Sequence, residues 1–277
     1  MTALKKIARK IVPPIAFDII KFVKLKKTFY GFKGNYIDWK TAAAQCTGWE
    51  SNDILEKVSQ STLDVKKNLS FFERDGELVS SQNYNFPVLA CLLRCINHEE
   101  LELNVIDFGG SFGSHYFRFK PFLNPAYELN WSVVEQQHYV EHANKNFKNA
   151  ELKFYTSIKE ALLDNKTNTF FSSGTIQYLE KPYEFINNLI NDSFDYIILD
   201  RIFMIEHQSD RIVIQEVNPD LFYNASFPAW LFNETRFIKA FLNKYELVAE
   251  FKSEDPDNSI DKLRIYHKGF FLKKKIS

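Results

Sequence analysis

The stretch that decides the fold reads Val105-Ile106-Asp107-Phe108-Gly109-Gly110-Ser111-Phe112-Gly113-Ser114-His115-Tyr116. The chain has nine glycines among its 277 residues, and three of them fall within this short window. Glycine allows a positive φ and lets a ligand approach the backbone where another residue would present a Cβ. An apolar run precedes the loop and a helical pattern follows it. We therefore expect the helix N-terminus to face a crevice at the carboxyl edge of a sheet.

An acidic residue follows the next strand at a spacing suited to a nucleoside. Glu135 ends the run WSVVE, 22 residues after Gly113. A carboxylate at this place accepts hydrogen bonds from ribose hydroxyls. We expect the loop, the acid, its neighbour and the serines that end a later strand to bind a cofactor. These residues are Asp107, Gly109, Gly110, Ser111, Gly113, Glu135, Gln136, Ser172 and Ser173.

The loop departs from the dinucleotide fingerprint Gly-x-Gly-x-x-Gly, because serine stands at its second and third glycine positions, 111 and 114. Asp107 lies just before the loop, where a carboxylate would repel a pyrophosphate. S-adenosylmethionine contains an adenosine, an amino acid and a sulfonium but no phosphate. The sequence therefore favours S-adenosylmethionine over NAD as the cofactor. The structural alternative is a plain tight turn beside a surface glutamate.

Short apolar runs alternate with helical stretches after residue 103, which predicts βαβ units and a parallel sheet. Two later runs, YELVAEFK and LRIYHKGFFLKK, are separated by too few residues for a crossover helix and should pair antiparallel. The segment RIVIQEV is an extra strand or hairpin, and a helix is expected near 233–244. The parallel strands are expected near 104–108, 131–135, 151–155, 169–173 and 194–200.

The chain divides into three parts by pattern. Residues 99–277 form the expected Rossmann-like α/β domain, and residues 28–98 form a helical annex or lid, with residues 31–98 mostly helical. Residues 1–27 carry eight basic residues and one acid, a net charge of +7, with apolar residues at helical spacing between them. Such a basic amphipathic segment lies on an anionic membrane surface, or else it docks on its own domain.

Composition excludes several classes of protein. Lys plus Arg equals Asp plus Glu at 35 each, which argues against a nucleic-acid binder. The sequence shows neither an apolar run long enough to cross a membrane nor a signal peptide. Three cysteines without a Cys-x-x-Cys motif do not indicate an oxidising compartment. We expect a cytoplasmic protein, peripheral at the inner face of the cytoplasmic membrane if residues 1–27 bind lipid. Its oligomeric state stays open.

The motifs resemble a family. VIDFGGSFGSHYF, WSVVEQ, FFSSGTIQYLEKPYEF, FDYIILDR, DRIVIQEV and FPAWLFN, with GWESNDILEKV, FERDG and FPVLACLL upstream, are similar to class I S-adenosylmethionine-dependent methyltransferase-like proteins of bacterial surface-polysaccharide biosynthesis clusters. The similarity covers about residues 30–270. It implies a mostly parallel Rossmann-like class I methyltransferase sheet whose last strand is antiparallel. It also implies O-methylation of a polysaccharide sugar or its precursor, although Ser111 stands where the broader Gly-x-Gly-x-Gly loop has glycine.

Other polar residues near the expected crevice are candidates for chemistry. A histidine in the first helical turn is a candidate proton acceptor, although a hydrogen bond at the helix start explains it equally. An Asp-Arg pair at a strand end is a candidate base and anion clamp, or a salt-bridged strand end. A tryptophan is a sugar-stacking candidate or a buried ring. The catalytic candidates are His115, Asp200 and Arg201, and the substrate-binding candidates are Gln177, Tyr178 and Trp230.

Three alternatives remain. The loop also matches Gly-x-Ser-x-Gly, the nucleophile elbow of serine hydrolases, with Ser111, Asp200 and His267 as the triad. The helical pattern of residues 1–98 and the nearby Asp107 charge argue against that interpretation. His138 to His142 match His-x-x-Glu-His, a zinc signature, but no downstream third ligand is placed, and we expect no metal. The last alternative is a non-catalytic scaffold at the membrane surface.

Overall fold

A mixed β-sheet forms the centre of the computed structural model, which describes residues 31–48, 52–67, 71–74, 76–80, 84–192, 194–217 and 225–276. The strand order is β11-β13-β8-β7-β4-β5-β6, with β12 paired to β13. β4 to β8 are mutually parallel, whereas β13 is antiparallel to both β8 and β11. The strands are β4 (Glu102–Phe108), β5 (Glu128–Val134), β6 (Leu152–Tyr155), β7 (Thr169–Ser173), β8 (Tyr196–Ile205), β11 (Tyr245–Lys252), β12 (Asn258–Ile260) and β13 (Leu263–Lys274).

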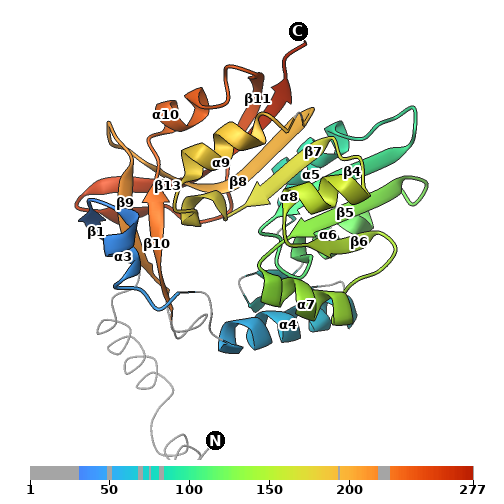
Figure 1. The fold of residues 1–277 in the computed structure, drawn as a ribbon, viewed down its shortest axis with the longest axis horizontal. Coiled ribbons are helices and arrows are strands. Elements are labelled where there is room, and N and C mark those ends of the chain that lie inside the picture. Colours follow the sequence, from blue (N-terminus) through green and yellow to red (C-terminus); the bar gives the residue numbers. More distant parts are fainter. Residues whose placement is uncertain are drawn as a thin grey trace, which may run out of the picture.

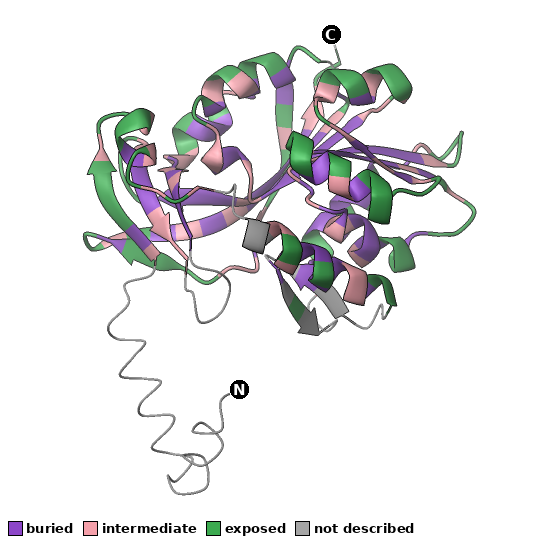
Figure 2. Ribbon diagram, turned by 60° about the horizontal axis from the view of Figure 1, so that its bottom comes forward, coloured by how far each residue is buried: buried purple, intermediate pink, exposed green. Residues whose placement is uncertain are grey.

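This sheet confirms the predicted Rossmann-like α/β fold, including the five parallel strands and the antiparallel pairing of the last two long runs. Successive side chains of β4 point to opposite faces of the sheet, and both sets are buried. Leu103 and Val105 pack in one hydrophobic cluster and Ile106 in the other. Helices therefore cover both faces, and Figure 2 shows the sheet as the buried layer between them.

One face of the sheet carries α5 (Phe86–Arg94), α6 (Ser114–Phe119) and α7 (Gln137–Asn146), whose buried residues join the cluster of Val105. The other face carries α8 (Ile158–Asp164), α9 (Pro182–Leu189) and α10 (Glu234–Lys239), which join the cluster of Ile106. Figure 1 shows α8 and α9 crossing in front of the sheet and α5 behind it. α10 is shorter than the helix predicted near 233–244. Among the described residues, no helix is long and apolar enough to cross a membrane.

The prediction that residues 31–98 are mostly helical is wrong for three strands. β1 (Gly31–Tyr36) pairs with β9 (Arg211–Glu216), which also pairs with β10 (Ser226–Leu231) in a separate sheet. β2 (Phe71–Arg74) and β3 (Glu77–Ser80) form a hairpin. Because the pairing partner of β1 lies far along the chain, the local pattern of apolar residues does not predict this strand. RIVIQEV forms β9 of this separate sheet.

Besides α5, two further helices of the predicted annex precede the central sheet in the described residues. α4 (Asn52–Lys67) packs against β2, β3 and α6, and the short α3 (Trp39–Ala43) packs against β9 and β10. Residues 1–27 and their predicted membrane contact lie outside the described residues. The division into three domains stays a prediction, although β1 joins the predicted annex to β9 of the predicted α/β domain.

The order of the strands in the sheet creates a crevice where a ligand can bind. From β4 the chain continues to β5 and β6 on one side, and later to β7 and β8 on the other. The order therefore reverses beside β4, and at such a switch point the loops diverge to leave a crevice at the carboxyl ends of the strands.

Candidate functional site

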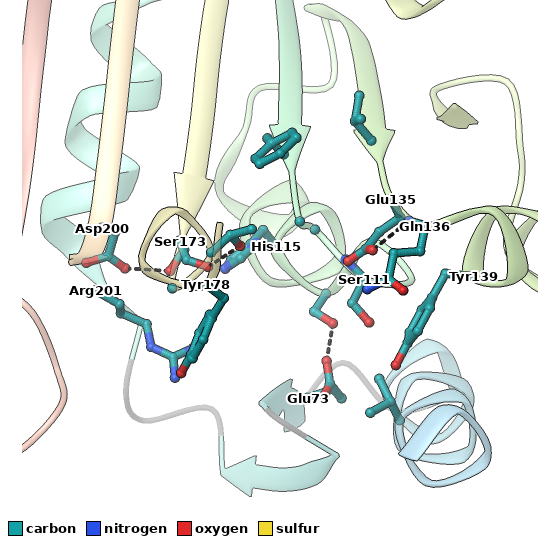
Figure 3. A pocket seen from close by; sticks show the side chains of 18 of the residues that line it. Glu73, Ser111, His115, Glu135, Gln136, Tyr139, Ser173, Tyr178, Asp200 and Arg201 are labelled. Carbon is teal, nitrogen blue, oxygen red and sulfur yellow. Dashed lines mark hydrogen bonds between the residues drawn. The ribbon is translucent and has the colours of Figure 1, made fainter. Parts of the chain in front are cut away.

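A cavity of about 430 Å³ opens at this switch point. Its walls come from the residues that follow β4, β5, β6 and β7 and from the middle of β8, with Val58 of α4 and Glu73 of β2 closing the opposite side (Figure 3). The volume falls within the range of small-ligand sites. The sequence predicted the sheet-edge wall of this cavity, and the annex supplies the wall that faces it.

Two glycines of the loop after β4 are required sterically. Gly109 has φ +75°, and a Cβ there would lie 2.2 Å from Thr175 Oγ1. A Cβ on Gly110 would lie 2.5 Å from Asp107 Cγ. The loop thus runs directly over the buried ends of β4 and β7. Ser111, at φ +54°, occupies the left-handed region without being glycine.

Glu135 ties this loop to the end of β5. Its Oε1 accepts a hydrogen bond from the Ser111 amide at 3.2 Å, and its Oε2 accepts one from the Gln136 amide at 2.9 Å. Burial raises the pKa of the Glu135 carboxyl, as does the charge of Asp107, while the two amides oppose the shift. A carboxylate has further acceptor positions beyond these two bonds, so Glu135 can still accept from ligand hydroxyls on the cavity side.

Asp107 lies beneath the loop and is fully buried. Its Oδ2 accepts a hydrogen bond from Trp131 Nε1 at 3.0 Å and lies 3.3 Å from His115 Nδ1. Both of these contacts join Asp107 to rings beneath the loop. His115 reaches the cavity wall and rests on Asp107.

Arg201 sits at a bulge in β8. It has φ +57°, and the pairing with β13 shifts register opposite it. Its amide donates to Ser253 Oγ at 3.0 Å, and its carbonyl accepts from Gln177 Nε2 at 3.1 Å. Its Nε donates to Asp255 Oδ2 at 2.8 Å. The bulge redirects the side chain out of the strand toward the cavity, where the guanidinium lies beside Gly174.

Asp200 is almost fully buried, with 1% of its surface exposed. Its Oδ2 accepts from Asn85 Nδ2 at 2.9 Å and Ser173 Oγ at 3.0 Å, and its Oδ1 accepts from Ser253 Oγ at 2.8 Å. These three hydrogen bonds occupy both oxygens of the carboxylate and anchor it at the ends of β7 and β8, an arrangement that does not suit the predicted role of base.

Charged residues that the sequence analysis did not identify complete the cavity. Arg118 Nη2 of α6 donates to Glu254 Oε1 at 2.7 Å, and both side chains are largely buried. Glu73 Oε1 accepts from the Gly76 amide at 2.7 Å, and Glu73 Oε2 accepts from the Ser114 hydroxyl. Among the described lining residues, four carboxylates face two guanidiniums, a formal excess of two negative charges. This wall favours a cationic ligand and disfavours a pyrophosphate.

A local signal for Glu73 was present in the sequence. The dipeptide Asp75-Gly76 separates FFER from ELVS, and in a sequence this dipeptide favours the two-residue turn of a β-hairpin. Tyr139 likewise lies one helical turn after Glu135, on the side of α7 that faces the cavity. By contrast, the pairing of Arg118 with Glu254 joins residues 136 positions apart, which no local pattern reveals.

Ten predicted site residues line the cavity and five do not. Ser172 Oγ donates to the Phe108 carbonyl at 3.0 Å, and Gln177 is fully buried against the Arg201 carbonyl. Trp230 stacks on Trp39 with ring centroids 6.4 Å apart and does not line this cavity, and its contact with substrate stays a prediction. The cavity brings together Gly109, Gly110, Ser111, His115, Glu135, Gln136, Ser173, Tyr178, Asp200 and Arg201, and it leaves out Asp107, Gly113, Ser172, Gln177 and Trp230.

The two rival motifs do not assemble. Ser111 Oγ is buried and has no hydrogen-bond partner among the described residues, and His267 packs against Phe203 away from the cavity lining. A serine nucleophile needs a base within hydrogen-bond reach. In the zinc-like motif, His142 Nε2 lies 2.7 Å from Ser59 Oγ. The described part of the chain contains no group of three or more His, Cys, Asp or Glu residues arranged to hold a metal.

Comparison with family models finds no match, and comparison with curated proteins finds none either. Comparison with solved structures finds alignments that cover between 69% and 71% of this chain. An S-adenosylmethionine-dependent methyltransferase from Clostridium acetobutylicum is 10% identical, with a TM-score of 0.45 over 71% of this chain and 92% of that one. A second from Methanosarcina mazei is 11% identical, with a TM-score of 0.47 over 69% and 98%. Magnesium protoporphyrin IX methyltransferase from Synechocystis, with bound SAH, is 15% identical, with a TM-score of 0.43 over 69% and 81%.

Proposed function

We propose that this protein is an S-adenosylmethionine-dependent methyltransferase. The observation that carries the proposal is an acidic cavity at the switch point of the sheet, bordered by a close-packed glycine loop and by Glu135. S-adenosylmethionine carries an ammonium, a sulfonium and one carboxylate, so its net charge is positive and complements this wall. The resemblance of the motifs to class I methyltransferases supports the same cofactor.

The geometry supports the following cofactor-binding roles. Glu135 accepts hydrogen bonds from the ribose hydroxyls, while its bonds to the amides of Ser111 and Gln136 hold it in place. Gly109 and Gly110 allow the cofactor to approach the loop backbone. Ser111 lines the same wall, and its amide is the one that donates to Glu135.

Bound S-adenosylmethionine supplies an activated methyl group for in-line displacement by a nucleophile. The protein mainly supplies position, and such positioning contributes about 7–11 kcal/mol in well-aligned reactions. We assign the proton-accepting role to His115, because it lines the cavity and its Nδ1 lies 3.3 Å from Asp107 Oδ2, which orients the ring. Asp200 positions the walls, and Arg201 contacts the acceptor.

For the acceptor we propose a hydroxyl of a surface-polysaccharide sugar or its precursor. This class rests on the motif resemblance, and the cavity offers polar groups suited to hydroxyls at Tyr178, Arg118 and Glu254. We further propose that the protein acts at the inner face of the cytoplasmic membrane through residues 1–27. Replacing their lysines and arginines by glutamine in the full chain should abolish sedimentation with anionic liposomes, and unchanged sedimentation would contradict this placement.

Isothermal titration calorimetry tests the cofactor assignment. We expect the wild-type protein to bind S-adenosylmethionine and S-adenosylhomocysteine but not NAD. Glu135→Gln should weaken both by about tenfold or more, since a hydrogen bond to a charged group is lost. The absence of binding at millimolar cofactor would overturn the proposal and leave a non-catalytic scaffold. Labelling of Ser111 by a fluorophosphonate would instead indicate a hydrolase.

A further inference from the structure

Glu73 is a carboxylate that the annex places on the wall of the cofactor cavity. It lies in β2, outside the α/β core, and only 6% of its surface is exposed. In Figure 3, Glu73 points toward the glycine loop from the opposite side of the cavity. Glu73 is therefore a polar group of the annex that borders the same cavity as the glycine loop.

Two neutral donors hold the carboxylate in place. The Gly76 amide, at the turn of the hairpin, donates to Oε1 at 2.7 Å, and the Ser114 hydroxyl, at the start of α6, donates to Oε2. These two hydrogen bonds fix the direction of the carboxylate. A carboxylate has about four acceptor positions, so a ligand group can bind to the same oxygens.

The position of Glu73 relative to Glu135 indicates which part of the cofactor it meets. Glu135 binds the amide of Ser111, and Glu73 binds the hydroxyl of Ser114, three residues further along the chain. Tyr139 lies within the electrostatic reach of both carboxylates, which add to burial in raising its pKa. The two acids are therefore neighbours along one ligand. If Glu135 holds the ribose, Glu73 lies beside the amino-acid end.

We propose that Glu73 binds the α-ammonium group of the cofactor and so makes the annex hairpin a part of the cofactor site. This inference rests on the proposed function. At a water-poor wall the attraction between an ammonium and a carboxylate is much stronger than in water. Glu73 thereby selects ligands that retain the amino-acid end.

The test compares two ligands that differ in that end. S-adenosylhomocysteine carries the ammonium, whereas 5′-methylthioadenosine keeps the adenosine and thioether but lacks the amino acid. By calorimetry, Glu73→Gln should raise the Kd for S-adenosylhomocysteine about 10- to 100-fold, as expected for a charged hydrogen bond. The Kd for 5′-methylthioadenosine should stay within about twofold because its contacts do not include Glu73. The matched control, Glu135→Gln, should weaken both ligands.

A second measurement does not depend on the variant folding. The analogue of S-adenosylhomocysteine that lacks the α-amino group should bind the wild-type protein as weakly as Glu73→Gln binds S-adenosylhomocysteine. Equal losses for S-adenosylhomocysteine and 5′-methylthioadenosine in Glu73→Gln, or no loss for either, would overturn the inference while leaving the proposed function intact. If the wild-type protein binds neither ligand, the proposed function fails, and the inference fails with it.

Discussion

The contact between Gly110 and the buried carboxylate of Asp107 makes a quantitative prediction about the loop. A Cβ at position 110 would lie 2.5 Å from Asp107 Cγ and 2.5 Å from its Oδ2. Carbon atoms pack at about 3.5–4.0 Å, so the side chain would have to move by about 1 Å or more. Asp107 is fully buried and bonded to Trp131, so it has no room to move. Gly110 does not adopt a positive φ, and the effect of alanine there is therefore purely steric.

The expected energies follow from that geometry. Gly110→Ala should destabilise the protein by about 1–3 kcal/mol, the usual cost of overpacking a buried site. Asp107→Ala leaves the Trp131 indole N–H without its acceptor and should cost about 1–3 kcal/mol or more. Asp107→Ala removes the three atoms nearest to the added Cβ, so adding Gly110→Ala in that background should cost less than about 0.5 kcal/mol.

Urea unfolding followed by tryptophan fluorescence measures this double-mutant cycle. The coupling energy between the two positions should be about 1–3 kcal/mol, so the double variant should be about as stable as Asp107→Ala alone. Gly109→Ala serves as a control, because its φ of +75° and its contact with Thr175 do not depend on Asp107. Additive losses, with Gly110→Ala costing the same in both backgrounds, would refute the packing described here.

Three further predictions concern the cavity and its surroundings. Because burial raises the pKa of Glu135 above its ordinary 4.5, the stability contributed by this group should fall as pH rises from 4.5 through the raised pKa. Affinity for S-adenosylhomocysteine should fall as pH drops through that same raised pKa, and calorimetry on Glu135→Gln should show no such dependence. Trp230→Phe should leave this affinity unchanged, since the ring stacks outside the cavity, and a tenfold loss would contradict that placement. A thiol reagent at pH 8 should modify Cys46 before Cys91 and Cys95, because burial raises the pKa of Cys91 to about 12 and the pKa of Cys95 further. Mass spectrometry of the modified peptides reads out the order.

Local sequence patterns were enough to predict the central sheet and the wall of the cavity that the sheet edge forms. Successive side chains in β4 alternate between two apolar clusters, and the run that encodes them is visible without any partner. Glycines at 109 and 110 indicate that other atoms lie close to the loop backbone, and the structure leaves no room for a Cβ at either position. Glu135 follows from its position after the second strand, since the carboxyl ends of parallel strands meet at one edge.

Only the tertiary structure decided the other wall. Glu73 reaches Ser114 across 41 residues, Arg118 reaches Glu254 across 136, and Gly31 pairs with Glu216 across the chain. The bulge at Arg201 likewise depends on distant residues. The side chains of Ser253 and Gln177 form the hydrogen bonds with the Arg201 amide and carbonyl that a neighbouring strand would otherwise provide. By itself, the sequence determined the elements whose patterns repeat within a few residues and the loop whose geometry excludes side chains. Which distant charges would face one another was decided by chain folding, because such pairings gain their energy only when separate segments are packed together.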